Sequence, residues 1–132
     1  MIYTLLYLLL GIVGTIPLLI YAHNKPTHTK HIIYGQALII AAMVYVSFAV
    51  YAGNLFWLAI ETAGVLVYAT LYFASKRWGL YLLAIAWLLH PAWDAGLHLL
   101  GAGADVAPYW YAVACMSFDV VIGVYLLIWG KQ

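Results

Sequence analysis

Five apolar runs, each about as long as a membrane-spanning helix, constrain this chain more than any other feature. A helix needs about 20 consecutive, mostly apolar residues to cross the hydrocarbon core of a bilayer. Short polar or turn-forming segments, such as HNKPTHTKH and SKRWG, separate the runs. The runs cover about residues 2–22, 32–51, 55–74, 80–100 and 109–129. The sequence therefore predicts an all-α membrane protein, with residues 1–132 forming a single compact up-and-down bundle.

The composition excludes a soluble domain. Hydrophobic residues make up 68% of the chain and charged residues 7%, which leaves too little polar surface for a globular protein in water. Membrane lipids are therefore the expected surroundings, and no nucleic-acid partner is expected. A monomer of this size buries little surface, so a homo-oligomer stays open as an alternative.

The basic residues predict the orientation of the bundle. All five fall in the first loop, in the third loop or at the C-terminus: Lys25, Lys30, Lys76, Arg77 and Lys131. Positively charged short loops are retained on the cytoplasmic side of a membrane. The sequence therefore predicts an outside N-terminus, a cytoplasmic C-terminus and a multi-pass protein of the bacterial cytoplasmic (inner) membrane.

Three of the four acidic residues, Glu61, Asp94 and Asp119, lie inside predicted spans. At about 1.5 Å per residue, His90 and Asp119 fall near the midplane, Glu61 and Asp94 about 5–6 Å further out, and His98 about 12 Å out. His90, Asp94 and His98 are spaced four apart, so in an α-helix they form one stripe. Three spans thus offer polar groups at matching depths.

These intramembrane carboxylates need neutralisation. A charge near the bilayer centre costs several kcal/mol unless it is paired, protonated or hydrated. No lysine or arginine lies within a predicted span, so His90 and His98 are the candidate cations for three carboxylates. Bound protons, a metal ion or both must supply the remaining neutralisation.

Metal binding suits the donor types. Imidazole and carboxylate ligands fit zinc, iron, manganese or copper, and bundle metal sites are built from facing helices in this way. The predicted metal ligands are His90, Asp94, His98, Asp119 and Glu61, with Cys115 at the periphery. Trp87 and Trp93 are predicted to line a pocket for a cofactor or lipophilic ligand. A proton-titrating or purely hydrogen-bonded polar core remains an equal alternative.

The segment that carries the stripe also contains Pro91. Proline cannot donate a hydrogen bond to the carbonyl of Trp87, so the sequence predicts a local irregularity in this helix beside His90.

The last third of the chain resembles a known family. The run WLLHPAWDAGLH, followed by PYW and CMSFDVVIGVYLL, is similar to an uncharacterised family of small bacterial integral membrane proteins, a domain of unknown function. The resemblance pairs an H-x-x-W-D-x-x-x-H-like helix with a C-x-x-x-D-like helix. The matching residues are His90, Trp93, Asp94, His98, Cys115 and Asp119. The resemblance implies no established activity.

Three classes of function follow. The first is an enzyme for a lipophilic small molecule, with His90 and Asp94 as catalytic groups, and it should have a lateral opening to lipid. The second is a proton or metal-ion channel or transporter, which needs a hydrated path to both faces. The third is a non-catalytic subunit or assembly factor of a larger membrane complex. The enzyme is favoured because the polar groups concentrate in one half of the membrane.

Overall fold

The computed structural model describes residues 1–130 as a helical bundle. Its long helices are α1 (Ile2–His23), α2 (Thr27–Tyr51), α3 (Leu55–Trp78), α4 (Leu80–Trp93) and α5 (Tyr109–Trp129), with a π-helix η1 (Asp94–Leu99) and a 3-10 helix η2 (Ala102–Asp105) between α4 and α5. No strand occurs in this part of the chain. When η1 is counted with α4, five helices are long and apolar enough to cross a membrane. The predicted fold class is therefore confirmed. Lys131, used above for orientation, lies outside the described residues.

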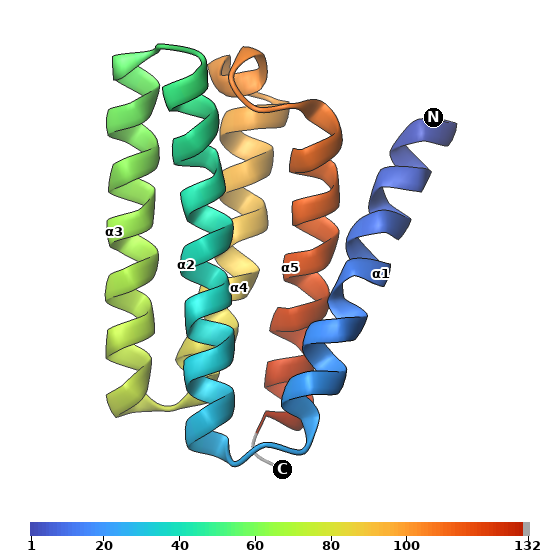
Figure 1. The fold of residues 1–132 in the computed structure, drawn as a ribbon, viewed down its shortest axis with the longest axis vertical. Coiled ribbons are helices and arrows are strands. Elements are labelled where there is room, and N and C mark those ends of the chain that lie inside the picture. Colours follow the sequence, from blue (N-terminus) through green and yellow to red (C-terminus); the bar gives the residue numbers. More distant parts are fainter. Residues whose placement is uncertain (131–132) are drawn as a thin grey trace.

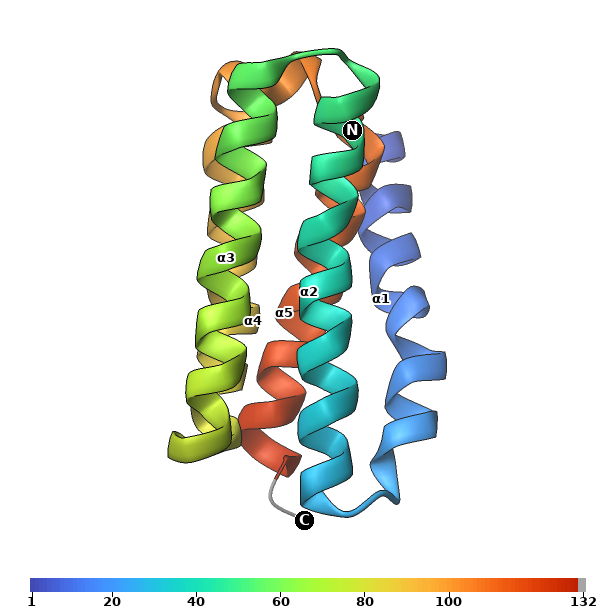
Figure 2. The same ribbon diagram turned by 60° about the vertical axis from the view of Figure 1, so that its left-hand side comes forward.

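The helices run up and down, with α1 at the edge. Helices α2, α3, α4 and α5 stand side by side, and α1 leans against α5 (Figure 1). In the turned view α3 lies in front of α4, while α1 stands at the opposite side of the bundle (Figure 2). Although α1 and α2 are consecutive, α1 packs mainly against α5 and touches α2 little. Most of the α1 surface is thus left to face lipid.

Two helices are longer than their apolar runs. Helix α2 begins at Thr27, five residues before the expected start at residue 32, because Pro26 takes the N-cap position and the polar turns after it are already helical. Helix α3 continues through Lys76 and Arg77 to Trp78. Basic side chains at a helix C-terminus interact favourably with the helix dipole. The polar helix ends therefore extend past the apolar runs from which the spans were predicted.

The fourth span changes its helical form beside the polar residues. Helix α4 continues through Pro91 to Trp93, and the chain then widens into the π-helix η1, which starts at Asp94 and includes His98. The i→i+5 hydrogen bonds of a π-helix place more residues in each turn than an α-helix does. Residues four apart beyond Asp94 therefore no longer share the face that α-helical spacing predicts.

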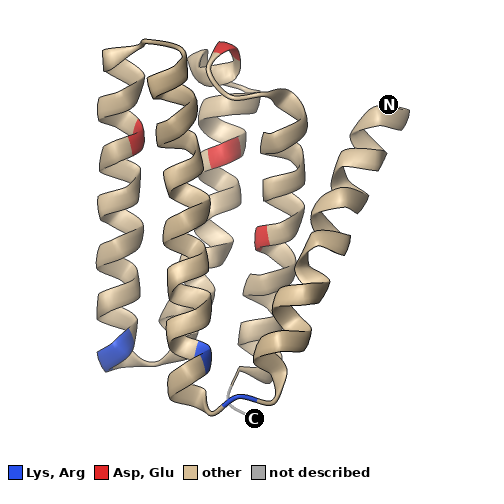
Figure 3. Cartoon of the chain, viewed as in Figure 1, with Lys and Arg blue, Asp and Glu red and all other residues tan. Residues whose placement is uncertain are grey.

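The interior has an apolar half and a polar half. At the end that carries the described lysines and arginine, the core is closed by large buried side chains, among them Tyr34, Leu38, Leu83, Trp87, Ile122 and Leu126. The acidic residues lie in the other part of the bundle (Figure 3). The described basic and acidic side chains are thus separated along the length of the molecule.

Candidate metal centre

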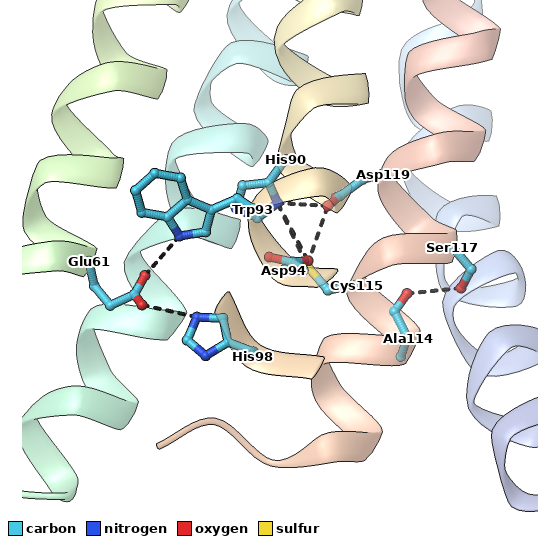
Figure 4. Close-up of polar contacts among 9 residues, drawn as sticks. All are labelled: Glu61, His90, Trp93, Asp94, His98, Ala114, Cys115, Ser117 and Asp119. Carbon is cyan, nitrogen blue, oxygen red and sulfur yellow. Dashed lines mark hydrogen bonds and ion pairs between the residues drawn. The ribbon is translucent and has the colours of Figure 1, made fainter. Parts of the chain in front are cut away.

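Four side chains that can ligate a metal converge between α4, η1 and α5. His90, Asp94, Cys115 and Asp119 each offer one ligand atom, and these atoms lie within 4.8 Å of one another (Figure 4). His90, Asp94 and Asp119 are buried, and Cys115 is 8% exposed. The group lies beside the point where α4 becomes a π-helix.

The contacts within the group centre on Asp119. With its proton on Nδ1, His90 donates to Oδ2 of Asp119 over 2.6 Å. The thiol of Cys115 donates to the same oxygen over 3.6 Å. Oδ2 of Asp94 lies 3.9 Å from Nδ1 of His90, at the distance of an ion pair. One imidazole therefore faces two carboxylates.

Several polar atoms of the group have no hydrogen-bond partner in the described chain. They are both carboxylate oxygens of Asp94, Oδ1 of Asp119 and Nε2 of His90. Asp94 is 0% exposed. Buried polar groups are almost always hydrogen-bonded, and the hydroxyl of Tyr45 and the thiol of Cys115 face the Asp94 carboxylate without supplying a cation to it. The described lysines and arginine cannot supply it, because they lie at the far end of the bundle (Figure 3).

The donor atoms lie close to the spacing of ligands around a single metal ion, and small movements would bring them to it. A tetrahedral ion with bonds of about 2.0–2.3 Å holds its ligands about 3.3–3.8 Å apart. Nδ1 of His90 lies 3.9 Å from Oδ2 of Asp94 and 4.0 Å from Sγ of Cys115. The 2.6 Å contact between His90 and Asp119 would open as an ion enters between them. Nitrogen, sulfur and carboxylate oxygen together are donors that zinc and other transition metals accept.

The same residues do not form a nucleophilic triad. In a Cys–His–Asp relay the carboxylate orients one ring nitrogen while the other nitrogen activates the thiol. Here Asp119 and Cys115 both lie against Nδ1 of His90, at 2.6 and 4.0 Å, and Nε2 has no hydrogen-bond partner. The arrangement favours ligation over activation of the thiol.

A second polar group holds the other predicted ligands, Glu61 and His98. Nε2 of His98 lies 2.9 Å from Oε1 of Glu61 as an ion pair, without the alignment of a hydrogen bond. The indole of Trp93 donates to Oε2 of Glu61 over 3.3 Å. Nδ1 of His98 lies 3.1 Å from the carbonyl oxygen of Gly103. Glu61 and His98 are therefore held with each other, outside the four-ligand group.

Two tyrosine rings lie between the groups. Tyr45 stacks on His98, with centroids 4.5 Å apart, and its centroid is 6.0 Å from that of His90. Tyr68 packs edge-on against His90 at 4.8 Å and against Trp93 at 6.3 Å. The two groups are thus separate in hydrogen bonding but share one aromatic wall.

The two tryptophans predicted to line a pocket have different surroundings. Trp87 is buried and donates to the carbonyl oxygen of Tyr34, within the apolar half of the core. Trp93 lies over α3 at Gly64, where an added Cβ would come within 2.9 Å of the indole. Their predicted role in binding a ligand stays a prediction.

The fold and this cluster define a class of protein: a multi-helix, membrane-type bundle with a buried His/Asp/Cys group that could bind metal. The chain belongs to a family of unknown function, DUF6010, whose profile matches residues 6–132. No curated protein and no solved structure matches the chain. The expected membership of an uncharacterised family is confirmed.

Proposed function

We propose that the protein is a membrane-embedded metalloprotein in which His90, Asp94, Cys115 and Asp119 bind one transition-metal ion. The observation that carries the proposal is that two buried carboxylates, Asp94 and Asp119, share one imidazole, that of His90, and have no described lysine or arginine beside them. A divalent cation would neutralise Asp94 and Asp119 together and occupy their free oxygens. Zinc fits the mixed donor set best, and iron, manganese and copper accept the same ligand types.

Within the class of metalloproteins, we propose that the protein is an enzyme that acts on a lipophilic substrate. A catalytic zinc keeps three protein ligands and an open position. His90, Asp94 and Asp119 are the deepest members of the group, and Cys115 lies at its more exposed edge. With all four ligands bound the ion would have no open position, so in the enzyme the Cys115 thiolate would have to be displaced, and the ion would then polarise a substrate oxygen or activate water on that side. His90 and Asp94 are the groups placed to ligate or to exchange a proton.

The apolar half of the bundle supports an enzyme over a channel. Conduction requires a hydrated or polar path to both faces of the membrane. Between His90 and Asp119 and the end of the bundle with the basic residues, the core is filled by buried side chains: Leu83, Trp87 and Ile122. A proton or metal-ion pathway would have to displace these side chains.

The distribution of charge supports an orientation. Lys25, Lys30, Lys76 and Arg77 lie at the end where α1 meets α2 and α3 meets α4 (Figure 3). By the preference of basic loops for the cytoplasm, that end is cytoplasmic in our proposal, and the membrane is the bacterial inner membrane. The metal centre then lies in the outer half of the bilayer.

Elemental analysis of protein purified in mild detergent tests the metal centre. Inductively coupled plasma mass spectrometry should find about one metal ion per chain in the parent and a loss of that metal in His90→Ala and Asp94→Asn. Asp105→Asn is the matched control, because it is the same substitution at an exposed residue of η2. Absence of metal in the parent, before and after incubation with zinc, would overturn the proposal. Protonated carboxylates would then account for the site.

A further inference from the structure

A lateral groove opens between α1, α2 and α5. It has a volume of about 480 Å³, within the range of about 300–1,000 Å³ typical of small-molecule sites. Three large exposed residues, Leu10, Ile40 and Trp110, lie along it. Because the helices on either side are candidate membrane spans, the groove opens toward lipid and away from water.

Large aromatic rings bridge α2 and α5 on either side of the groove. Toward one end of the helices Tyr45 packs against Tyr111 with ring centroids 5.4 Å apart, and toward the other Tyr34 packs against Tyr125 at 6.0 Å. The lining of the groove includes five small residues: Gly11 and Gly14 on α1, Ala37 and Ala41 on α2, and Ala114 on α5. The aromatic contacts hold the helices apart where the small side chains leave space.

Helix α1 is fixed as the outer wall of the groove. A Cβ at Gly11 would overlap the carbonyl oxygen of Ala114 and the hydroxyl of Ser117, so glycine is needed for this close approach to α5. Ser117 in turn donates to the carbonyl oxygen of Leu8 over 2.9 Å. Gly14 is different, because a Cβ there would meet Phe118 at an ordinary 3.7 Å. The groove beside Gly14 therefore has room for a larger side chain at this position.

The floor of the groove reaches the candidate metal centre. Cys115 lines the groove, and its Sγ lies 3.6 Å from Oδ2 of Asp119 and 4.0 Å from Nδ1 of His90. A second apolar groove, between α3 and α4, is lined by Val67 and Trp93 and includes none of the four candidate ligands. Of these two grooves, the α1/α2/α5 groove is the one with a candidate ligand in its lining.

We infer that this groove admits one hydrocarbon chain of a membrane lipid and delivers it to the Cys115 side of the centre. The lining has no charged side chain, so an acyl chain can enter without desolvating a charge. The bilayer around the spans supplies such chains. If the proposed metal centre is present, it follows that its substrate is a lipid or lipid-like molecule bound by its hydrocarbon chain. This part of the inference rests on the proposed function. Entry of the chain itself requires no metal.

Photo-cross-linking tests the groove directly. The protein is reconstituted in phosphatidylethanolamine and phosphatidylglycerol vesicles containing a phospholipid with a diazirine on one acyl chain, and cross-linked residues are mapped by mass spectrometry. Ile16, 48% exposed, reports contact with bulk lipid, and Leu83, 0% exposed, reports the background. Cys115 should cross-link at a yield nearer to that of Ile16 than to that of Leu83, although it is itself 8% exposed.

Filling the groove should remove this signal. Val44→Trp places a large side chain in the groove, and Val67→Trp is the matched control in the α3/α4 groove. Val44→Trp should lower the Cys115 yield roughly tenfold, the factor that corresponds to about 1.4 kcal/mol of binding, while Val67→Trp leaves it unchanged. Gly14→Leu fills the same groove from α1 and replaces Val44→Trp if that variant does not fold.

The results of these experiments test the lipid-binding groove and the metal centre as two separate proposals. A Cys115 yield at the Leu83 background, or one unaffected by both filling variants, overturns the inference even if the protein contains metal. Cross-linking of Cys115 that is lost on filling, in protein without metal, supports the groove as a lipid site and contradicts the proposed metal centre. Metal content is therefore measured on the same samples.

Discussion

The two histidines of the fourth span, His90 and His98, have opposite surroundings. His98 faces one carboxylate, Glu61, at 2.9 Å, and its other nitrogen lies against a backbone carbonyl. His90 shares its Nδ1 between two carboxylates, Asp119 at 2.6 Å and Asp94 at 3.9 Å. The first group balances its charges with one imidazole and one carboxylate. The second group has two carboxylates and one imidazole. The two groups contain similar residue types and differ in net charge, and the unbalanced negative charge marks the second as the candidate metal site.

The largest effect on metal binding should come from removing the carboxylate of Asp119, and removing that of Glu61 is the comparison. Asp119→Asn should release the metal, with a loss of affinity at least as large as the roughly 10–100-fold that changes around metal ligands produce. Glu61→Gln should retain the metal, because Glu61 lies in the other group. Metal content after equilibrium dialysis against a zinc buffer is the measurement. Equal loss in both variants would show that the two groups act as one site.

Breaking the balanced pair should cost stability instead. His98→Ala leaves the buried Glu61 without its cation, which destabilises proteins by about 3–5 kcal/mol. The free energy of unfolding in urea, measured in detergent micelles, should show this loss. The double variant Glu61→Gln/His98→Ala should be more stable than the sum of the single effects, since no buried charge remains. Simple additivity would contradict the pairing.

Metal binding should stabilise the four-ligand group and not the pair. At a free zinc concentration 100 times the dissociation constant, binding to the folded state adds about 2.7 kcal/mol. The midpoint of thermal unfolding should therefore rise with zinc and fall with a chelator in the parent and in Glu61→Gln. Asp94→Asn should show no dependence on zinc, and a preserved shift in that variant would place the ion elsewhere.

The smallest effect concerns the position of Trp93 over α3. Gly64→Ala places a methyl group 2.9 Å from the indole and should displace it, at a cost of about 1–3 kcal/mol. A changed tryptophan emission with unchanged metal content would assign Trp93 to the balanced group. Gly96→Ala is the control, because its added Cβ meets nothing within 4 Å. Loss of metal in Gly64→Ala would instead link Trp93 to the centre.

The sequence was sufficient for the class of fold. Each apolar run became a helix, and Tyr109–Trp129 agrees with its predicted bounds of 109–129. The differences lie at polar helix ends, such as Thr27 and Trp78, because hydropathy reports the hydrocarbon thickness and helical hydrogen bonding continues beyond it. The packing of α1 against α5 has no counterpart in the pattern of apolar runs.

The candidate site was only partly predictable. The charges inside the apolar runs are sufficient to predict His90, Asp94 and Asp119, because this prediction does not depend on the type of helix. Cys115 was expected at the periphery, although its spacing of four from Asp119 places both on one α-helical face. The prediction that His98 lies on the same face as His90 assumes α-helical spacing, and the segment that contains His98 is the π-helix η1. Local π-helix is set by tertiary packing, which the sequence pattern does not report.

The chain contains a single cysteine, and that cysteine lies against the candidate centre. A spectroscopically active ion in place of zinc, such as cobalt, would therefore have one thiolate to bond with in each molecule. Any thiolate-to-metal charge-transfer absorption of the purified protein would then arise from Cys115 alone. The visible spectrum would report the state of this one bond, without a label and without background from other sites.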